Sequence, residues 1–212
     1  MGVQILASVV YICIQAASSS ISVEARMECD SHADTSVVGK NSLMFHDYGR
    51  PVRVSGYHPR DGVKECRTVS AAVAYDHPQT GQVYILIINQ AIEIPHLENH
   101  LLCPMQCRVN GVRVNDVPNI LVDNPDTTTH ASGVPDPIDK SNMLYLPLSS
   151  SGVTSYFHCR KPTTAEFDNE ESHPRIKLTA EEPLWDPGSD NYSSSEDCMV
   201  DLMERVVCRE RF

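Results

Sequence analysis

The chain has 212 residues, of which 41% are hydrophobic, so it is long and apolar enough to bury a core, and wholesale disorder is excluded. Only 6% of the residues are aromatic, while 14 are proline and 10 are glycine, which favours short strands joined by turns over a helical bundle. A net charge of −11 and a pI of about 5.2 argue against nucleic acid or an anionic membrane as a partner.

Residues 1–20 form an apolar leader of uncertain role. The stretch 3–14 is largely apolar and is followed by AASSS, as in a signal peptide, but the first basic residue is Arg26, whereas a signal peptide normally has one near its start. The stretch is too short to span a membrane. The sequence favours a buried strand or a non-native leader sequence in an intracellular protein, with a cleaved signal and a secreted protein as the alternative.

Residues 21–160 are predicted to form one β domain. The strands expected from β-branched and apolar runs are 21–27, 35–38, 50–54, 68–75, 83–88, 92–97, 111–117, 119–122, 143–148 and 153–158. Two apolar runs around DHPQTGQ predict a hairpin over 75–88, and a second hairpin is expected around SSSG between 143 and 158. One short helix is expected within 100–109, limited by Pro104, and a loop over 122–139.

Residues 161–212 are polar and acidic. From Ala165 onward the chain has 13 acidic and 5 basic residues, a local net charge of −8, and few apolar residues. This composition predicts a largely disordered acidic C-terminal tail.

The cysteines are eight in number and scattered along the chain. A chain of this length builds a core without disulfides, so we expect mostly reduced, buried thiols. His96, His100, Cys103 and Cys107 are zinc-ligand types on one face of an ideal helix, but along a straight helix they would spread over about 16 Å and could not converge on one ion. We therefore predict no metal and no other cofactor.

The stretch CDSHADT, residues 29–35, is the one segment that points to chemistry. It places the carboxylate of Asp30 in a tight loop after a predicted strand, with a hydroxyl beside it, a small residue close by and a second carboxylate at Asp34. Aspartic proteases use two such loops, because two carboxyl groups a few Å apart share one proton and together activate a water. An ordinary Asx or Ser/Thr turn between two strands is the alternative interpretation of these residues.

DSHADT resembles the active-site loop of retropepsins, and the wider chain resembles the protease region of copia-type retrotransposon polyproteins, in particular the subgroup whose loop reads DSHADT. Three later segments, YDHPQTGQVYILIINQAI, NHLLCPMQCRVNGVRVND and LPLSSSGVTSYFHCRKPT, are also similar to segments of such polyproteins. The resemblance covers roughly residues 28–187. It implies a mostly β, retropepsin-like closed core and an aspartic endopeptidase that acts on a polyprotein or peptide.

The resemblance also implies roles for the loop residues. Asp30 aligns with the catalytic aspartate, Ser31 with the residue that braces the paired loops of a dimer, and Ala33 and Asp34 with contacts to the substrate backbone. Only one such loop is present, so the active site would need a homodimer. Asp126 begins a Thr-rich loop that could be imagined as a second catalytic loop, but it lacks the following Gly-Ala pattern. The hairpin 75–88 is the candidate for a flap over the cleft.

His32 departs from the family pattern, because retropepsins have glycine at this position. Glycine allows unusual backbone angles, and a histidine ring here would sit beside the catalytic carboxylates. The alternative function is therefore a catalytically inactive, truncated or domesticated retrotransposon fragment that acts as a binding or assembly module.

Overall fold

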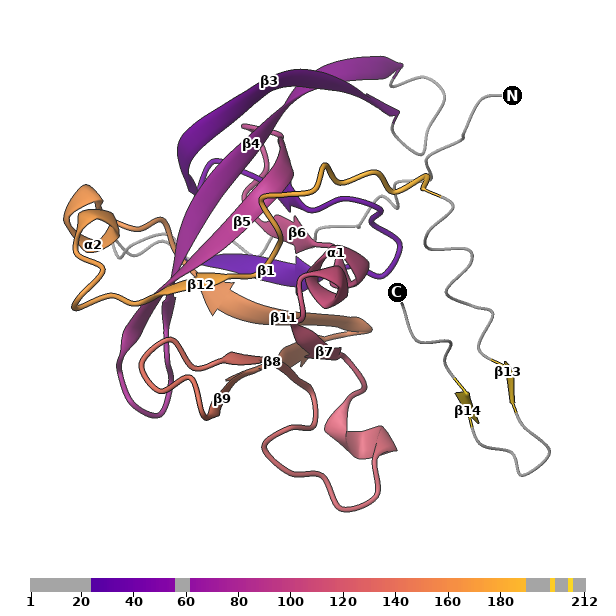
Figure 1. Ribbon diagram of the computed structural model, residues 1–212, viewed down its shortest axis with the longest axis vertical. Coiled ribbons are helices and arrows are strands. Elements are labelled where there is room, and N and C mark those ends of the chain that lie inside the picture. The colour runs from indigo at the N-terminus through magenta and orange to yellow at the C-terminus, as the bar shows by residue number, and fades with distance from the viewer. Residues whose placement is uncertain (1–23, 56–61, 190–198, 201–205, 208–212) are drawn as a thin grey trace.

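The computed structural model (Figure 1) describes residues 24–55, 62–189, 199–200 and 206–207. The predictions made for residues 1–20 lie outside this part of the chain. Among the described residues, no helix is long and apolar enough to cross a membrane.

The fold is mostly β, as predicted, and is built around a nine-stranded sheet. Its strands are β1 (Ala25–Cys29), β2 (Val37–Val38), β3 (Leu43–Ser55), β4 (Val63–Asp76), β5 (Val83–Glu93), β6 (His100–Leu102), β10 (Ser149–Ser151), β11 (Thr154–Cys159) and β12 (Arg175–Lys177). Their order is β10-β11-β1-β6-β2-β5-β4-β3, and β12 adds to β5 in parallel. A three-stranded sheet contains β7 (Arg113–Asn115), β8 (Ala131–Pro135) and β9 (Met143–Pro147), and β13 (Met199–Val200) pairs with β14 (Val206–Val207).

The described strands do not form the closed core that the resemblance implied. β3 at one edge of the large sheet pairs with β4, and β10 at the other edge pairs with β11. An isolated bridge between Ala74 and Arg160 joins the ends of β4 and β11. The sheet is therefore strongly folded over but stays open, because β3 and the first half of β4 extend away from the core as a projecting hairpin (Figure 1).

The hairpin predicted over 75–88 is confirmed. β4 and β5 pair antiparallel with Tyr75 opposite Tyr84, and the His77 amide donates to the Gln82 carbonyl at 2.9 Å to close the turn. Gly81 has φ +68°, a conformation that glycine adopts without strain. The strands of this hairpin belong to the core and not to a flap, because Tyr75 and Tyr84 are at most 5% exposed and residues 85–88 are buried.

Both faces of β5 and of the second half of β4 are buried. Alternate residues contribute to two apolar clusters, which explains why VYILII lacks the polar alternation of a half-exposed strand. Val73 and Leu86 belong to the large central cluster, while Ala74 and Ile85 belong to a smaller one that Phe167 covers from the C-terminal segment. The face of the sheet that carries Ala74 and Ile85 therefore needs a further layer of residues to cover it.

Four local predictions are wrong. Residues 119–122, expected as a strand, form a 3₁₀ turn (Asn119–Leu121), and the expected loop 122–139 contains β8. The hairpin around SSSG joins β10 to β11, whereas β9 pairs with β8. Instead of one helix there are two short α-helices, α1 (Pro104–Val109) and α2 (Thr164–Asp168); Pro104 starts α1, where its missing N–H is not needed.

The prediction of a disordered tail from residue 161 is wrong for residues 161–189. Thr163 and Glu166 cap α2 reciprocally, and Arg160 holds Glu166 at 2.6 Å and Asp76 at 2.9 Å, which fastens α2 to β4. β12 then adds to β5, and the Leu178 amide donates to the Ile87 carbonyl at 2.9 Å. Leu178 is fully buried in the central cluster, so this segment is part of the core.

Replacing Leu178 by alanine is expected to lower the free energy of unfolding by about 2–5 kcal/mol, because it opens a cavity in the core. Leu121→Ala is the matched control: its side chain is 74% exposed, and the change is expected to cost less than about 0.5 kcal/mol. Urea unfolding followed by circular dichroism measures both. Equal midpoints for the two variants would show that residues 161–189 do not pack on the domain.

Candidate active site

Asp30 lies directly after β1, in the loop that links this strand to β2. Its amide donates to the Leu102 carbonyl of the parallel strand β6 at 3.1 Å, and its carboxylate oxygen Oδ1 accepts from the His32 amide at 2.9 Å. The Ala33 amide donates to the Asp30 carbonyl at 3.1 Å, which closes a tight turn. The side chain of Asp30 is 15% exposed, so its carboxylate is largely shielded but still reaches solvent.

The loop is held in place by α1. The Gln106 side chain accepts from the Ser36 amide at 3.0 Å, and the Ser36 hydroxyl accepts from the Cys103 amide at 3.0 Å. Gln106 also donates to the carbonyls of Asn89 and Gln90 at 3.4 Å. Gln106 and Ser36 are both buried. One buried amide thus ties together the loop after β1, the helix and the end of β5.

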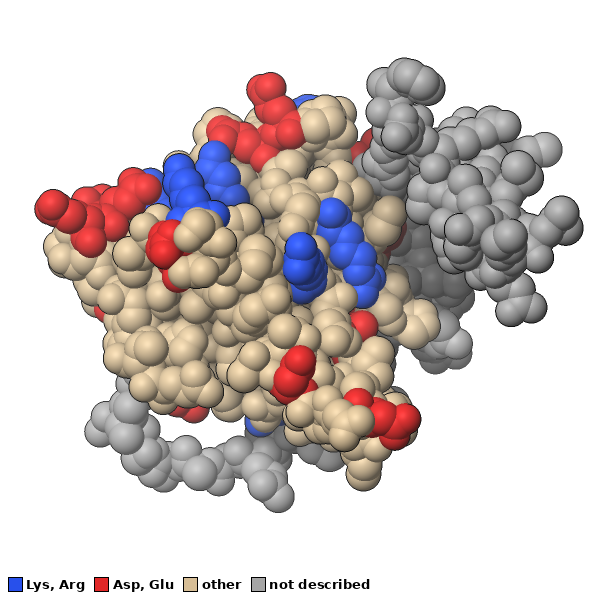
Figure 2. All heavy atoms as spheres, turned by 60° about the horizontal axis from the view of Figure 1, so that its bottom comes forward, with Lys and Arg blue, Asp and Glu red and all other residues tan. Residues whose placement is uncertain are grey.

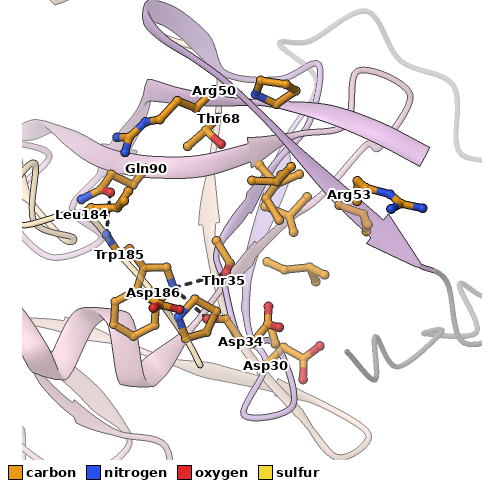
Figure 3. A pocket seen from close by; sticks show the side chains of 18 of the residues that line it. Asp30, Asp34, Thr35, Arg50, Arg53, Thr68, Gln90, Leu184, Trp185 and Asp186 are labelled. Atoms are coloured by element: carbon orange, nitrogen blue, oxygen red, sulfur yellow. Dashed lines mark hydrogen bonds between the residues drawn. The ribbon is translucent and has the colours of Figure 1, made fainter. Parts of the chain in front are cut away.

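Asp30 opens into a cavity of about 460 Å³. Its floor is formed by the loop after β1, its roof by the projecting hairpin of β3 and β4, and one side by residues 184–187 (Figure 3). The apolar lining side chains are Ala33, Val37, Val52, Val54, Ile92, Leu101, Leu184 and Trp185. A mainly apolar cleft with a few polar groups, among them carboxylates, is typical of a site that binds a substrate and excludes water.

Four of the five predicted site residues line this cavity. Asp30, His32, Ala33 and Asp34 are among its lining residues, whereas Ser31 is exposed and is not. The bracing role proposed for Ser31 concerns a second chain, so this position is compatible with it but does not test it. The flap prediction is corrected: the cleft is roofed by residues 50–54 of β3, and no residue of 75–88 lines it.

His32 fits the loop without backbone strain. The positive-φ residues of the described chain that are not glycine are Gln90, Asn124 and His130, so the histidine does not occupy a conformation reserved for glycine. Its side chain is 77% exposed, and its Nδ1 lies 3.8 Å from Oδ1 of Asp30. The imidazole therefore stands at the mouth of the cleft, beside the carboxylate.

Two residues that line the cleft, Arg50 and Trp185, are not predicted from the sequence. Arg50 lies on β3, and its side chain reaches toward the part of the cleft where Gln90 and Leu184 lie (Figure 3). Trp185 comes from the segment predicted to be disordered and donates from its indole nitrogen to the Asp34 carbonyl at 2.9 Å. No local pattern marks these residues, because Arg50 reaches the cleft through the pairing of β3 with β4, and Trp185 reaches it from a segment distant in the sequence.

The other nucleophile types of the described chain are poorly placed for chemistry. Burial raises the pKa of the Cys29 thiol to about 12 and also raises that of Cys103, so neither is a thiolate near neutral pH. His130 lies 2.9 Å from the Ser155 hydroxyl, but both residues are buried and neither lines the cleft. A cysteine or serine nucleophile in the cleft is therefore not supported.

The structure also bears on disulfides, on a metal site and on the loop that begins at Asp126. The five described cysteines, Cys29, Cys66, Cys103, Cys107 and Cys159, are free, and no group of His, Cys, Asp or Glu side chains in the described residues could hold a metal ion. Asp126 is exposed and accepts from the Thr128 amide at 2.8 Å, which makes an Asx turn. On the face shown in Figure 2, basic and acidic side chains are interspersed among uncharged ones.

Comparison with known proteins adds no identity: no protein-family model, no curated protein and no solved structure matches this chain.

Proposed function

We propose that this chain is an aspartic endopeptidase of retrotransposon origin that hydrolyses peptide bonds as a homodimer. Asp30 of each chain contributes one of the two catalytic carboxyl groups. The observation that carries the proposal is the placement of Asp30: a shielded carboxylate after a strand, in a hydrogen-bonded loop, at the floor of an apolar cleft roofed by a projecting hairpin. The partners are a second copy of the chain and a polyprotein or peptide.

The chemistry follows from a pair of carboxyl groups that share one proton. The ionised carboxyl takes a proton from a water, the water oxygen attacks the peptide carbonyl, and the protonated carboxyl gives its proton to the carbonyl oxygen. Collapse of the tetrahedral intermediate then breaks the C–N bond, with a proton passing to the leaving amine. The loop contacts of Asp30 and the apolar walls orient the carboxylate and limit competing water.

The test is a cleavage assay at high protein concentration with a panel of unstructured peptides, from about pH 4 to pH 7. Activity is expected to peak on the acidic side of neutral, where a carboxyl pair holds one proton, and to fall on both sides. Activity is also expected to vanish on dilution below the dimer dissociation constant. Cleavage that is independent of protein concentration would contradict the proposal.

His32 favours a second candidate, an inactive fragment that serves as a binding or assembly module. Its ring lies at the mouth of the cleft, 3.8 Å from the Asp30 carboxylate, where retropepsins would have no side chain. If the wild-type chain cleaves no peptide while His32→Gly does, the ring is an obstruction and the binding function is favoured. If neither the wild type nor His32→Gly cleaves a peptide but both bind peptides, the result supports the binding function and not the protease function.

A further inference from the structure

Residues 180–187, called the strap below, run along the cleft that contains Asp30. Leu184, Trp185, Asp186 and Pro187 are among the residues that line it (Figure 3). In Figure 1 the strap follows β12 and passes between α1 and the projecting hairpin of β3 and β4. A segment of the chain itself therefore forms one wall of the proposed substrate cleft.

Gln90 holds the strap through its main chain. Its side-chain nitrogen donates to the carbonyls of Ala180, Glu181 and Pro183 at 3.1, 3.1 and 2.8 Å, and its side-chain oxygen accepts from the Trp185 amide at 2.7 Å. Gln90 has φ 54°, a left-handed conformation that is costly for a residue other than glycine. All four contacts are to main-chain groups, which every peptide has whatever its side chains. The side chain of Gln90 can therefore hold the main chain of another peptide in the same way.

The indole of Trp185 docks on the active-site loop. Its nitrogen donates to the Asp34 carbonyl at 2.9 Å and to the Thr35 hydroxyl at 3.2 Å. These groups lie within the DSHADT loop, next to the residues expected to contact substrate. The aromatic side chain of Trp185 therefore lies in the cleft beside the loop, at a place that a side chain of a bound peptide would take.

Most of the strap is exposed to solvent. Of residues 181–187, Trp185 is half-buried and the others are exposed, with Leu184 58% exposed. Segments with little buried apolar surface open at low free-energy cost. Thr68 in addition lines the cleft, is 8% exposed, and has a buried hydroxyl without a hydrogen-bond partner. This hydroxyl is left without a hydrogen-bond partner while the strap is in place.

We propose that the strap is an intramolecular ligand of the cleft, and that an extended peptide carrying a large aromatic side chain must displace it in order to bind. The inference rests on the proposed function only for the peptide nature of the ligand, and it does not require catalysis. It predicts that the cleft prefers peptides similar to the strap and that the strap competes with them.

The experiment measures binding to the full chain carrying Asp30→Asn, so that no probe is cleaved. The probe is a fluorescein-labelled peptide with the sequence of residues 180–189 and Trp185→Phe. Binding is measured by fluorescence anisotropy. A chain that also carries Leu184→Ala and Trp185→Ala is expected to bind the probe with a Kd about tenfold or more below that of the strap-intact chain. The reason is that the intact strap is a competitor at high effective concentration, and the variant strap is not. Leu121→Ala, in an exposed turn outside the cleft, is the control and should bind like the strap-intact chain.

A second readout uses the strap-intact chain alone. Trp185 is the only tryptophan of the chain, so an unlabelled form of the same peptide should shift the emission of the protein to the red as the indole leaves the cleft. Equal affinities of the two folded chains, binding without an emission shift, or no binding to either chain would overturn the inference. If the strap variant does not fold, the emission readout decides. Displacement of Trp185 without any cleavage by the wild type would remove the proposed protease function and leave the inference standing.

Discussion

Replacing Asp30 by asparagine is expected to abolish peptide cleavage while leaving the fold intact. Asparagine keeps an oxygen that can accept from the His32 amide, so the loop retains its hydrogen bond. It cannot ionise or share a proton, and the loss in kcat is expected to be about 10⁴-fold or more, the size seen when an essential catalytic group is removed. Cleavage of a fluorogenic peptide and near-UV circular dichroism measure the two properties separately.

Mixing experiments then test whether two chains share one site. In a mixture of wild-type and Asp30→Asn chains, activity is expected to fall with the square of the wild-type fraction, because an active dimer needs Asp30 from both chains. Asp126→Asn is the matched control, since Asp126 is an exposed carboxylate in a turn outside the cleft, and its chains should form active dimers with the wild type. A linear decline with Asp30→Asn would mean that each chain acts alone.

The elements that could be predicted from sequence are those fixed by neighbouring residues. The hairpin of β4 and β5 has its turn residues and both apolar strands within one short stretch, and the structure forms it as expected. Asp30 was likewise expected after a strand, and it follows β1. The loop residues Asp30, His32, Ala33 and Asp34 reach one cleft because they are close in the chain.

The elements that were missed depend on distant partners. Acidic composition suggested disorder beyond residue 160, although Thr163 and Glu166 form a capping box, a local signal that marks a helix start. The run VYILII is a second local signal. It lacks polar alternation, which implies that both faces of the strand are buried, but it does not indicate which segments pack on them. Phe167 packs on one of these faces, and β12 pairs beside β5, both from about eighty residues or more further along the chain.

The roof of the cleft, formed by β3, and the wall formed by residues 184–187 were also missed. β3 was expected as a short strand at 50–54, but it extends over Leu43–Ser55 and pairs along β4, and this pairing places Arg50 and Val52 over the cleft. Trp185 reaches Asp34 across 151 positions of the sequence. A contact between segments as far apart as Trp185 and Asp34 depends on the packing of the whole core, which no local pattern encodes.

The contribution of His100 to the free energy of unfolding is expected to fall by about 3 kcal/mol between about pH 6.5 and pH 4. His100 lies on β6, is fully buried, and its Nδ1 accepts from the Gly39 amide at 3.0 Å. The neutral ring then carries its hydrogen on Nε2, which has no hydrogen-bond partner. Position 39, whose amide donates to His100, requires glycine, because an added Cβ would lie 2.3 Å from the Leu97 carbonyl oxygen.

Burial lowers the pKa of His100 from 6.5 to about 4. The unfolded chain therefore binds a proton at a higher pH than the folded chain, so the stabilisation is complete above pH 6.5 and is lost as the pH falls to about 4. Glu166 acts in a different window: the Arg160 guanidinium lowers the pKa of its carboxyl from 4.5 to about 2, so its contribution is lost only below about pH 4.5.

Urea unfolding across this pH range measures the effect. His100→Asn keeps an acceptor for the Gly39 amide and is expected to flatten the decline between about pH 6.5 and pH 4 by most of the 3 kcal/mol, whatever its stability at neutral pH. His46→Asn, at an exposed position on β3, should reproduce the wild-type slope. Parallel curves for the wild type and His100→Asn would show that this buried ring does not set the acid sensitivity.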